Sequence, residues 1–282
     1  MMLPRITHPR AQLRFWRAPF QDGGGIISLW NDTYPEIFDM AFPKVVSAAS
    51  DRWQPVPRDS SLKYLEFVPG SVSSEELRAI DLWASKYKQY VLIGKSEAIG
   101  EDFSGIMDYC MALDFTWANN ARTPVYNLVY DYKYQNKHEV LPALIGHVNE
   151  AIQYLPIPND ARRDIVIVSV PTHVSEKHKL PYQLACNLGA PTGFPCVSLT
   201  HSQEKPAVKN LSLKDKISVL ARLYGGIVDG PKLFKDKILI IVDDLYQSGA
   251  TMCGLGKVLR DYAPKAVVGL ACAKNLRDKD NI

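Results

Sequence analysis

The chain has 282 residues, of which 46% are hydrophobic and 22% are charged, so it can bury one or two cores and is not a disordered protein. Its formal net charge of +3 is too small to indicate nucleic-acid binding, and nucleic acid therefore stays open as a partner without support from charge. The 5 cysteines contain no C-x-x-C pair, which excludes a zinc ribbon and favours reduced thiols.

All 5 tryptophans lie within the first 117 residues, which predicts a separate N-terminal part. Within it we expect strands at 26–30, 62–68 and 90–93, because these runs are apolar or alternate. Ser73 and Glu76 have the spacing of a capping box and predict a helix that follows them. We assign residues 1–121 to an N-terminal α+β portion of unknown function.

The next stretch predicts a strand and then a helix. Residues 125–132 are rich in Val and Tyr and predict a strand. Leu141, Leu144 and Val148 follow at helical spacing, with Pro142 tolerated in the first turn. A Tyr-rich strand and an amphipathic helix are more often core than site.

Residues 164–170 (DIVIVSV) predict a second kind of strand, one that is buried on both faces. A polar, basic turn follows, and then a short helix over 183–188 that Gly189 would end. Residues 194–199 predict the next strand. The polar stretch 200–216 interrupts the alternation of strands and helices, and long loops of this kind are often lids or binding loops.

The strongest motif lies at 237–252 (KILIIVDDLYQSGATM). An uninterrupted apolar run predicts a buried strand at 237–242, with Asp243 and Asp244 at its carboxyl end, where open α/β sheets bind ligands. Gly249 tolerates a positive φ, and a helix that begins near Ala250 would direct unpaired N–H groups at an anion such as phosphate.

The motif has two other interpretations. A Walker B strand would need a G-x-x-x-x-G-K-[ST] loop, and none occurs in the chain. The two aspartates could also merely cap a helix at a Rossmann-like edge. The order of strands at 164–170, 194–199, 237–242 and 265–273, with helices between them, predicts an α/β fold with a parallel sheet over residues 122–282.

The 238–252 segment resembles the phosphoribosyl-pyrophosphate (PRPP) motif of type I phosphoribosyltransferases. TPVYNLVYDYKYQNK at 123–137 resembles the "LKY" segment of the ComF-like members, and VKNLS at 208–212 resembles part of their flexible loop. The resemblance implies a type I phosphoribosyltransferase fold with a hood or lid loop, in which the N-terminal portion replaces the family's zinc ribbon. It also implies Mg²⁺ as cofactor, carried by PRPP.

The resemblance assigns roles to individual residues. Asp243 and Asp244 would be catalytic and hold the ribose 2′ and 3′ hydroxyls. The 5′-phosphate would bind to Gln247, Ser248, Gly249, Ala250 and Thr251. Pyrophosphate would bind to Thr172, His173, Lys177 and Lys179, and the lid would contribute Lys205 and Lys209.

Two positions depart from the family pattern. Tyr246 stands where a second aliphatic residue is usual, and Gln247 stands where the hypoxanthine–guanine branch has an ionisable general base. Gln247 therefore argues against that branch, and His173 is the nearest other candidate for a base.

We therefore expect an enzyme that transfers phosphoribosyl from PRPP to an unidentified acceptor. The alternatives are a non-catalytic PRPP or nucleotide sensor, and an accessory or effector factor in DNA handling or defence. The oligomeric state stays open, and a homo-oligomer is one option. No run approaches the about 20 apolar residues that span a bilayer, and no signal peptide is evident, so we expect a cytoplasmic protein without a membrane partner.

Overall fold

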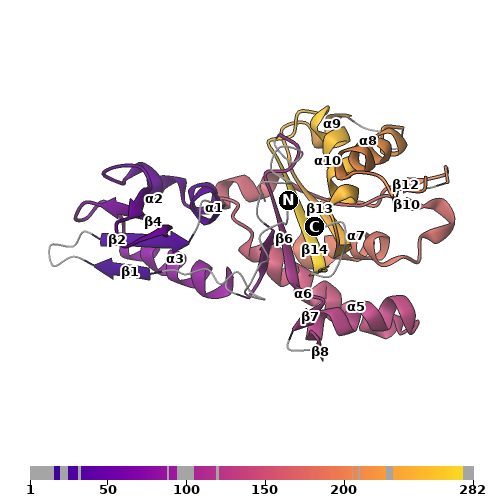
Figure 1. Cartoon of the computed structure of the whole chain (residues 1–282), viewed down its shortest axis with the longest axis horizontal. Helices are drawn as coiled ribbons and strands as arrows, with labels where there is room; N and C mark the ends of the chain where they lie inside the picture. Colours follow the sequence, from indigo (N-terminus) through magenta and orange to yellow (C-terminus); the bar gives the residue numbers. More distant parts are fainter. Residues whose placement is uncertain are drawn as a thin grey trace. The chain divides into compact units, whose positions relative to one another are not determined.

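The computed structural model describes residues 16–19, 25–30, 33–87, 89–93, 105–118, 121–204, 206–208, 210–226 and 231–275. The described residues form two compact units (Figure 1). The smaller unit comprises those of Arg10–Tyr90 and Tyr154–Asp160, and the larger unit comprises those of Val91–Gln153 and Ala161–Ile282. Each unit is described separately below.

The smaller unit is an antiparallel sheet with helices. Its strands are β1 (Trp16–Pro19), β2 (Gly25–Trp30), β3 (Gln54–Val56) and β4 (Asp59–Phe67), in the order β1-β2-β4-β3. Its helices are α1 (Thr33–Ala41), α2 (Pro43–Ser47) and α3 (Ser74–Tyr87). The predicted capping box is confirmed, because the Glu76 carboxylate accepts from Ser73 N–H at 2.8 Å and the Ser73 hydroxyl accepts from Glu76 N–H at 3.2 Å. Ile27, Phe38, Leu65 and Ile80 are fully buried in its core.

The larger unit contains a six-stranded sheet within the described residues, in the order β11-β9-β13-β14-β6-β5. The strands are β5 (Val91–Ile93), β6 (Tyr109–Phe115), β9 (Ile165–Ser169), β11 (Cys196–Val197), β13 (Ile238–Tyr246) and β14 (Ala266–Lys274). Five of them run parallel, and the edge strand β5 is antiparallel to β6. The α/β class with a parallel sheet is therefore as the sequence predicts.

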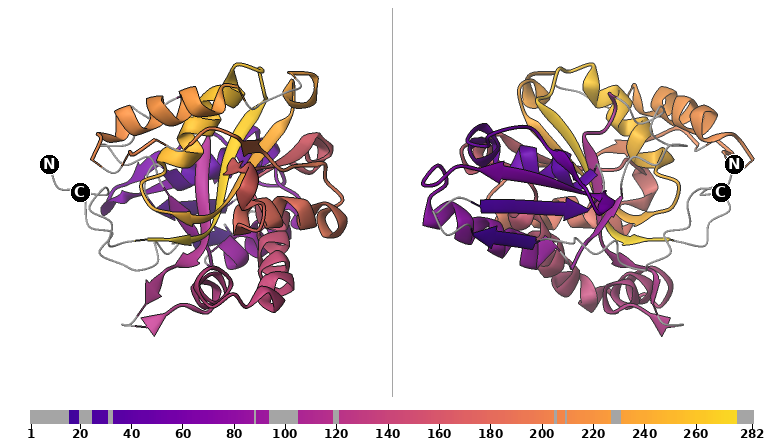
Figure 2. Two further views of the ribbon diagram at one scale, coloured as in Figure 1. Left: turned by 90° about the vertical axis from the view of Figure 1, so that its right-hand side faces the viewer. Right: turned by 60° about the vertical axis from the view of Figure 1, so that its left-hand side comes forward.

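Helices cover both faces of this sheet, which explains the unbroken apolar runs at residues 165–168 of β9 and 238–242 of β13. On one face α8 (Leu213–Tyr224) and α10 (Ala250–Arg260) pack on each other and on the strands, and the other face is covered by α5 (Pro124–Tyr134), α6 (Leu141–Tyr154) and α7 (Leu180–Thr192) (Figure 2). The core between the sheet and the first pair of helices includes Val168, Ile241, Ala271, Leu220 and Leu255.

The chain diverges between β9 and β13. From β9, helix α7 leads to β11 on one side, whereas from β13, helix α10 leads to β14 on the other side. The segments that follow these two strands therefore separate at the carboxyl edge of the sheet. In open α/β sheets this is the place where ligands bind.

Short elements complete the larger unit. They are β7 (Trp117–Ala118), β8 (Ala121–Arg122), β10 (Thr172–His173), β12 (Thr200–His201), α9 (Pro231–Phe234) and the 3₁₀ turns η1 (His138–Val140), η2 (Asn159–Asp164) and η3 (Val174–Glu176). Strands β10 and β12 pair in parallel beyond the ends of β9 and β11. Part of η2 belongs to the smaller unit.

The structure corrects several predicted elements. Residues 125–132 are not a strand but lie within helix α5, because Thr123 caps the helix and Pro124 occupies its first position. Helix α7 continues past Gly189 and ends instead at Gly193, which has φ +72°. The strand expected at 194–199 is only Cys196–Val197, and the segment 200–216 contains β12 and the start of α8.

The boundary of the larger unit also differs from the prediction. Strands β5 and β6 belong to its sheet although they precede residue 122.

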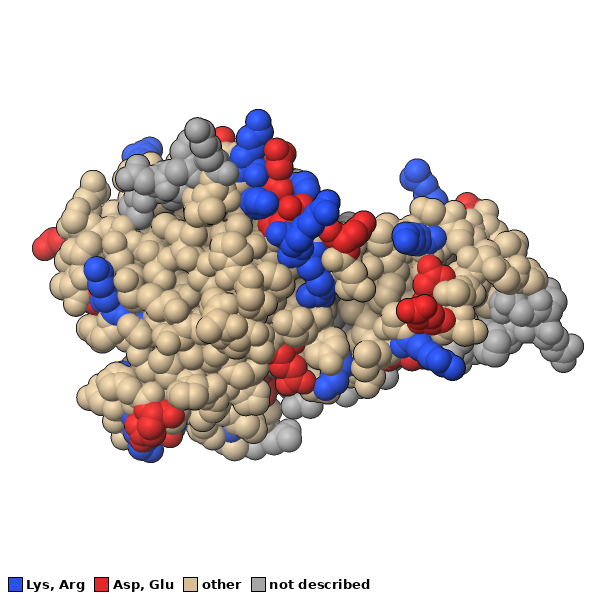
Figure 3. Space-filling view, turned by 180° about the vertical axis from the view of Figure 1, so that it is seen from behind, with Lys and Arg blue, Asp and Glu red and all other residues tan. Residues whose placement is uncertain are grey.

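Within the part of the chain that the structure describes, no helix is both long enough and apolar enough to cross a bilayer. On the face shown in Figure 3, basic and acidic side chains are interspersed.

Candidate functional site

Asp243 and Asp244, called the dyad below, lie near the end of β13. They are inside the strand rather than after it, because β13 extends to Tyr246. Their exposed fractions are only 8% and 9%. The Asp244 N–H donates to the Asp243 Oδ1 at 2.8 Å. Two adjacent carboxylates with so little exposure are costly unless they have partners.

Asp244 is paired with Lys133 of helix α5. The Lys133 Nζ lies 2.8 Å from the Asp244 Oδ2. Burial alone would lower the pKa of Lys133, but the charge of Asp244 and its hydrogen bond outweigh that effect and raise it. The sequence interpretation missed Lys133, because a strand at 125–132 gives no reason for the next side chain to reach the dyad. The helical spacing of Val125, Val129 and Tyr132 was the available signal.

The charge of Asp243 acts on a different group, the phenol of Tyr224 at the end of α8. Tyr224 is 1% exposed. Burial raises the pKa of Tyr224, and the negative charge of Asp243 raises it further. A phenol that stays neutral can serve as a hydrogen-bond donor at neutral pH. The charge of the dyad therefore acts on groups from two helices, Lys133 of α5 and Tyr224 of α8.

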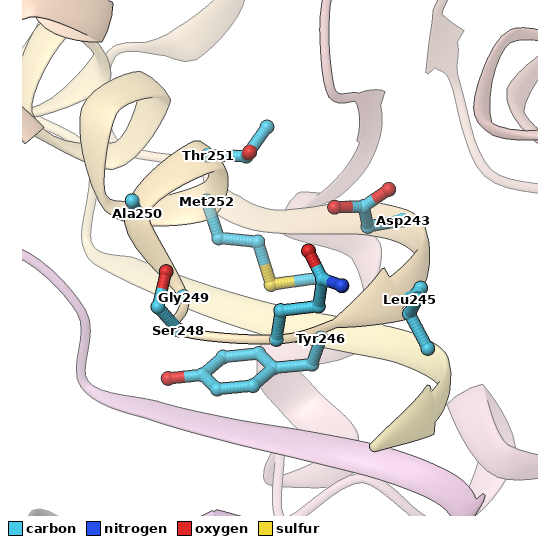
Figure 4. Close-up of a pocket in the computed structure, with 9 residues that line it drawn as sticks. Asp243, Leu245, Tyr246, Ser248, Gly249, Ala250, Thr251 and Met252 are labelled. Carbon is cyan, nitrogen blue, oxygen red and sulfur yellow. The ribbon is translucent and has the colours of Figure 1, made fainter. Parts of the chain in front are cut away.

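The turn from β13 into α10 forms a small pocket of about 60 Å³. It is lined by Asp243, Leu245, Tyr246, Gln247, Ser248, Gly249, Ala250, Thr251 and Met252 (Figure 4). Gly249 precedes the helix with φ +80° and offers no side chain to cap it. The first N–H groups of α10 are therefore available for an anion, and the structure brings all five residues predicted for the 5′-phosphate to this pocket.

Lys274, at the end of β14, forms a hydrogen bond with the backbone of this turn. Its ammonium donates to the Gln247 carbonyl and to the Asn275 carbonyl, each at 3.0 Å, and lies 5.0 Å from the centre of the Tyr246 ring. The Lys274 side chain is buried, with 6% exposure. This contact fixes the backbone just before the pocket, and no local sequence pattern indicated it.

The segment after β9 lies beside the dyad, because β9 pairs with β13 and the Val170 N–H donates to the Val242 carbonyl at 3.1 Å. Thr172 is 5% exposed, and its Oγ1 has no hydrogen-bond partner among the described residues. Buried hydroxyls are normally paired, so this one is suited to a ligand.

The other predicted pyrophosphate residues differ in their surroundings. His173 contacts Ser175 through Nδ1 at 2.6 Å and Ser202 O through Nε2 at 3.3 Å. Lys179 is exposed and forms an ion pair with Glu176 at 2.7 Å, which lowers the pKa of Glu176. Lys177 is exposed and forms no ion pair with any residue that the structure describes.

His201 is a further residue that the sequence interpretation missed. Strand pairing places it next to His173, with ring centres 5.6 Å apart, and its ring centre is 6.5 Å from that of Tyr224. It lines a second pocket of about 200 Å³. The two predicted lid lysines, Lys205 and Lys209, lie outside the described residues.

The carboxylate oxygens of the dyad are the type of ligand that Mg²⁺ prefers. No cluster of three or more metal-binding side chains occurs among the described residues.

A scan against models of protein families finds no match for this chain, and a search of curated proteins finds no relative.

Proposed function

We propose that the larger unit has a type I phosphoribosyltransferase fold, binds PRPP with Mg²⁺ and transfers the phosphoribosyl group to an acceptor. One observation carries the proposal: the pocket at the start of α10 follows directly on a strand that has two buried carboxylates among its last four residues. PRPP offers vicinal ribose hydroxyls close to a 5′-phosphate. The carboxylates and the pocket supply complementary groups at neighbouring positions.

The chemistry of the transfer explains why such groups are needed. As the bond from the anomeric carbon to pyrophosphate breaks, positive charge develops on the ribose and negative charge on the leaving group. The dyad can orient the ribose through its hydroxyls, and the α10 amides can hold the 5′-phosphate. The Thr172 hydroxyl and the Lys177 ammonium are available for the pyrophosphate.

A magnesium ion bound to PRPP would neutralise part of the pyrophosphate charge. Among the described residues, Asp243 and Asp244 are the groups that could contact it or its waters. Their remaining task is to accept hydrogen bonds from the ribose.

A sensor that binds PRPP without turnover is the second candidate. The ion pair between Lys133 and Asp244 favours it, because that carboxylate already has a strong partner in the protein without ligand. Gln247 adds to this argument, since its amide cannot ionise. Release of pyrophosphate distinguishes the two functions.

Isothermal titration calorimetry tests binding. PRPP with Mg²⁺ should bind more tightly than ribose 5-phosphate or pyrophosphate alone, because it engages both ends of the site. A coupled assay for pyrophosphate then separates transferase from sensor. If neither PRPP, ribose 5-phosphate nor a nucleotide binds at millimolar concentration, the proposed function is wrong.

A further inference from the structure

The imidazoles of His173 and His201 form different hydrogen bonds, and these show which ring nitrogen of each carries the proton. His173 Nδ1 accepts from the Ser175 N–H at 3.3 Å, so in the neutral ring the proton is on Nε2, which donates to the Ser202 carbonyl at 3.3 Å. Both nitrogens of His173 are therefore engaged. His173, the base candidate suggested by the sequence, has no free lone pair for a ligand.

His201 has the opposite arrangement. Its Nδ1 lies 2.8 Å from the Gln203 carbonyl, which can only accept, so Nδ1 carries the proton. In the neutral ring Nε2 therefore has a lone pair, and none of the described residues forms a hydrogen bond with it.

This lone pair belongs to a buried side chain beside a polar pocket. His201 is 7% exposed and lines the pocket of about 200 Å³ together with Thr200, Ser202, Gln203, Leu223 and Gly226. This volume is that of several water molecules and suits a small molecule. Because Nε2 accepts, the matching ligand must present an N–H or O–H group.

The pocket and the dyad lie at the same, carboxyl edge of the sheet, because β10 and β12 continue beyond β9 and β11, which run parallel to β13. Leu223 lines the pocket, and the next residue, Tyr224, has its ring centre 6.5 Å from that of His201. Strand β12 also pairs with β10, and the segment that leads into β10 runs beside β13, where the Val170 N–H donates to the carbonyl of Val242, the residue before Asp243. An acceptor held by His201 would thus be on the flank of a ribose held by Asp243.

We propose that this pocket is the acceptor subsite and that Nε2 of His201 takes the proton of the acceptor; this rests on the proposed function. The acceptor nitrogen or oxygen forms a bond to the anomeric carbon. The bond from that carbon to the pyrophosphate oxygen breaks, and its electron pair leaves with pyrophosphate. The acceptor's proton passes to His201 Nε2, and no oxidant or reductant is required. The substrate class is a small polar molecule with an N–H or O–H that must be lost.

The test measures PRPP binding and pyrophosphate release separately, at about pH 8, where an ordinary imidazole is neutral. Ammonium, hypoxanthine, guanine, adenine, uracil and orotate are the acceptor probes. His201→Gln should bind PRPP like the wild type and lose about 100-fold or more of its turnover. His201→Ala should lose as much and recover part of it on addition of free imidazole. His147→Gln, which changes an exposed histidine of α6, is the matched control and should be unchanged.

The possible failures are distinguishable. Absence of PRPP binding by the wild type would overturn the proposed function. PRPP binding without pyrophosphate release from any probe would overturn both the assignment of His201 and the transferase activity, and would leave the sensor. Normal turnover by His201→Gln would overturn the assignment of His201 alone. A variant that no longer binds PRPP and is not rescued by imidazole would also overturn it, because His201 would then act on the donor.

Reactivity toward diethyl pyrocarbonate tests the free lone pair without any turnover. Peptide mapping by mass spectrometry of the full chain should find His201 modified before His173. The reverse order would contradict the proton assignment.

Discussion

Asp243 and Asp244 are adjacent in the chain, yet their carboxylates meet different partners. The Asp244 carboxylate forms an ion pair with the Lys133 ammonium, whereas the charge of Asp243 helps to raise the pKa of the buried Tyr224 phenol. A ribose that binds both carboxylates would therefore have to share Asp244 with Lys133. The two residues of the dyad are consequently not equivalent, and single substitutions can separate them.

We expect Asp243→Asn and Asp244→Asn each to weaken PRPP binding by about 10- to 100-fold, because hydrogen bonds to a charged acceptor are worth about 1.5–3 kcal/mol. Asp244→Asn should also lower the free energy of unfolding by about 1 kcal/mol, since Lys133 loses its counter-charge. Calorimetry and urea unfolding measure the two effects.

Asp131→Asn is the control for these variants, because it removes the carboxylate of a more exposed ion pair, with Lys137 at 3.2 Å. It should leave PRPP binding unchanged. If the Asn variants of the dyad bind PRPP normally, the ribose site is elsewhere. If they fail to fold, the dyad is structural.

Gln247 carries a prediction about substrates. Its side chain cannot ionise, so a purine acceptor would have no base at this position. Hypoxanthine and guanine should therefore not be turned over efficiently by the wild type in a PRPP-dependent pyrophosphate assay. Efficient turnover of either purine would show that Gln247 does not exclude the hypoxanthine–guanine branch.

At the scale of elements, the sequence predicted β9, β13 and α10 well, because each depends on local signals. A run of β-branched residues marks a buried strand, and Gly249 marks the start of the helix that follows. Helix α5 was not predicted. Its Val and Tyr residues favour a strand by propensity, but the Thr123 cap and Pro124 at the first position favour a helix, and packing of one apolar face decides.

The contacts of the site were harder to predict than its motif. His201 reaches His173 only because β10 and β12 pair, and each of these strands has just two residues. The charge of Asp243 acts on the Tyr224 phenol only because α8 packs on the sheet. Such pairings join distant segments, and a local pattern of residue types does not encode them.

The turn before α10 gives a prediction at the element scale. Gly249→Ala places a Cβ at φ +80°, which costs about 1–2 kcal/mol or shifts the backbone. Because the shifted backbone is the one that presents the α10 amides, PRPP binding should weaken about 10-fold or more. Thermal unfolding and calorimetry measure the two effects.

Gly193→Ala is the matched control for this glycine. Gly193 has φ +72°, and a Cβ there meets no atom within 4 Å, so the strain is similar but the position is the end of α7. It should lower stability to a similar extent and leave PRPP binding intact. Equal loss of binding in both variants would mean that reduced stability, and not the geometry of the pocket, is responsible.

At the scale of the whole molecule, the sheet of the larger unit is assembled from distant parts of the chain. Strand β6 pairs with β14, so that Ala112 lies opposite Ala271. The sequence interpretation began this unit at residue 122, because the shift in composition near Trp117 suggested a boundary there. Pairing of β6 with a strand near the other end of the chain has no local signal, and the boundary was therefore placed too late.

Division into two units leads to a prediction about where ligand stabilises the protein. Each unit has its own buried core, with Phe38 and Leu65 in the smaller one and Ile241 and Leu255 in the larger. All the residues proposed to hold PRPP belong to the larger unit. A ligand that binds only the folded form stabilises it by about 2.7 kcal/mol at 100 times its dissociation constant.

Hydrogen exchange of the full chain, followed by mass spectrometry with and without PRPP and Mg²⁺, measures this effect by segment. Exchange should slow in peptides from β9, β13 and α10, where opening requires loss of the ligand, and should stay unchanged in peptides from β2, β4 and α3. Pyrophosphate alone is the control and should protect less of the β13–α10 segment, because it has no ribose for the dyad. Protection confined to the smaller unit would place the ligand outside the site built around Asp243 and Asp244. Protection of both units to the same extent would show that they unfold as one cooperative body.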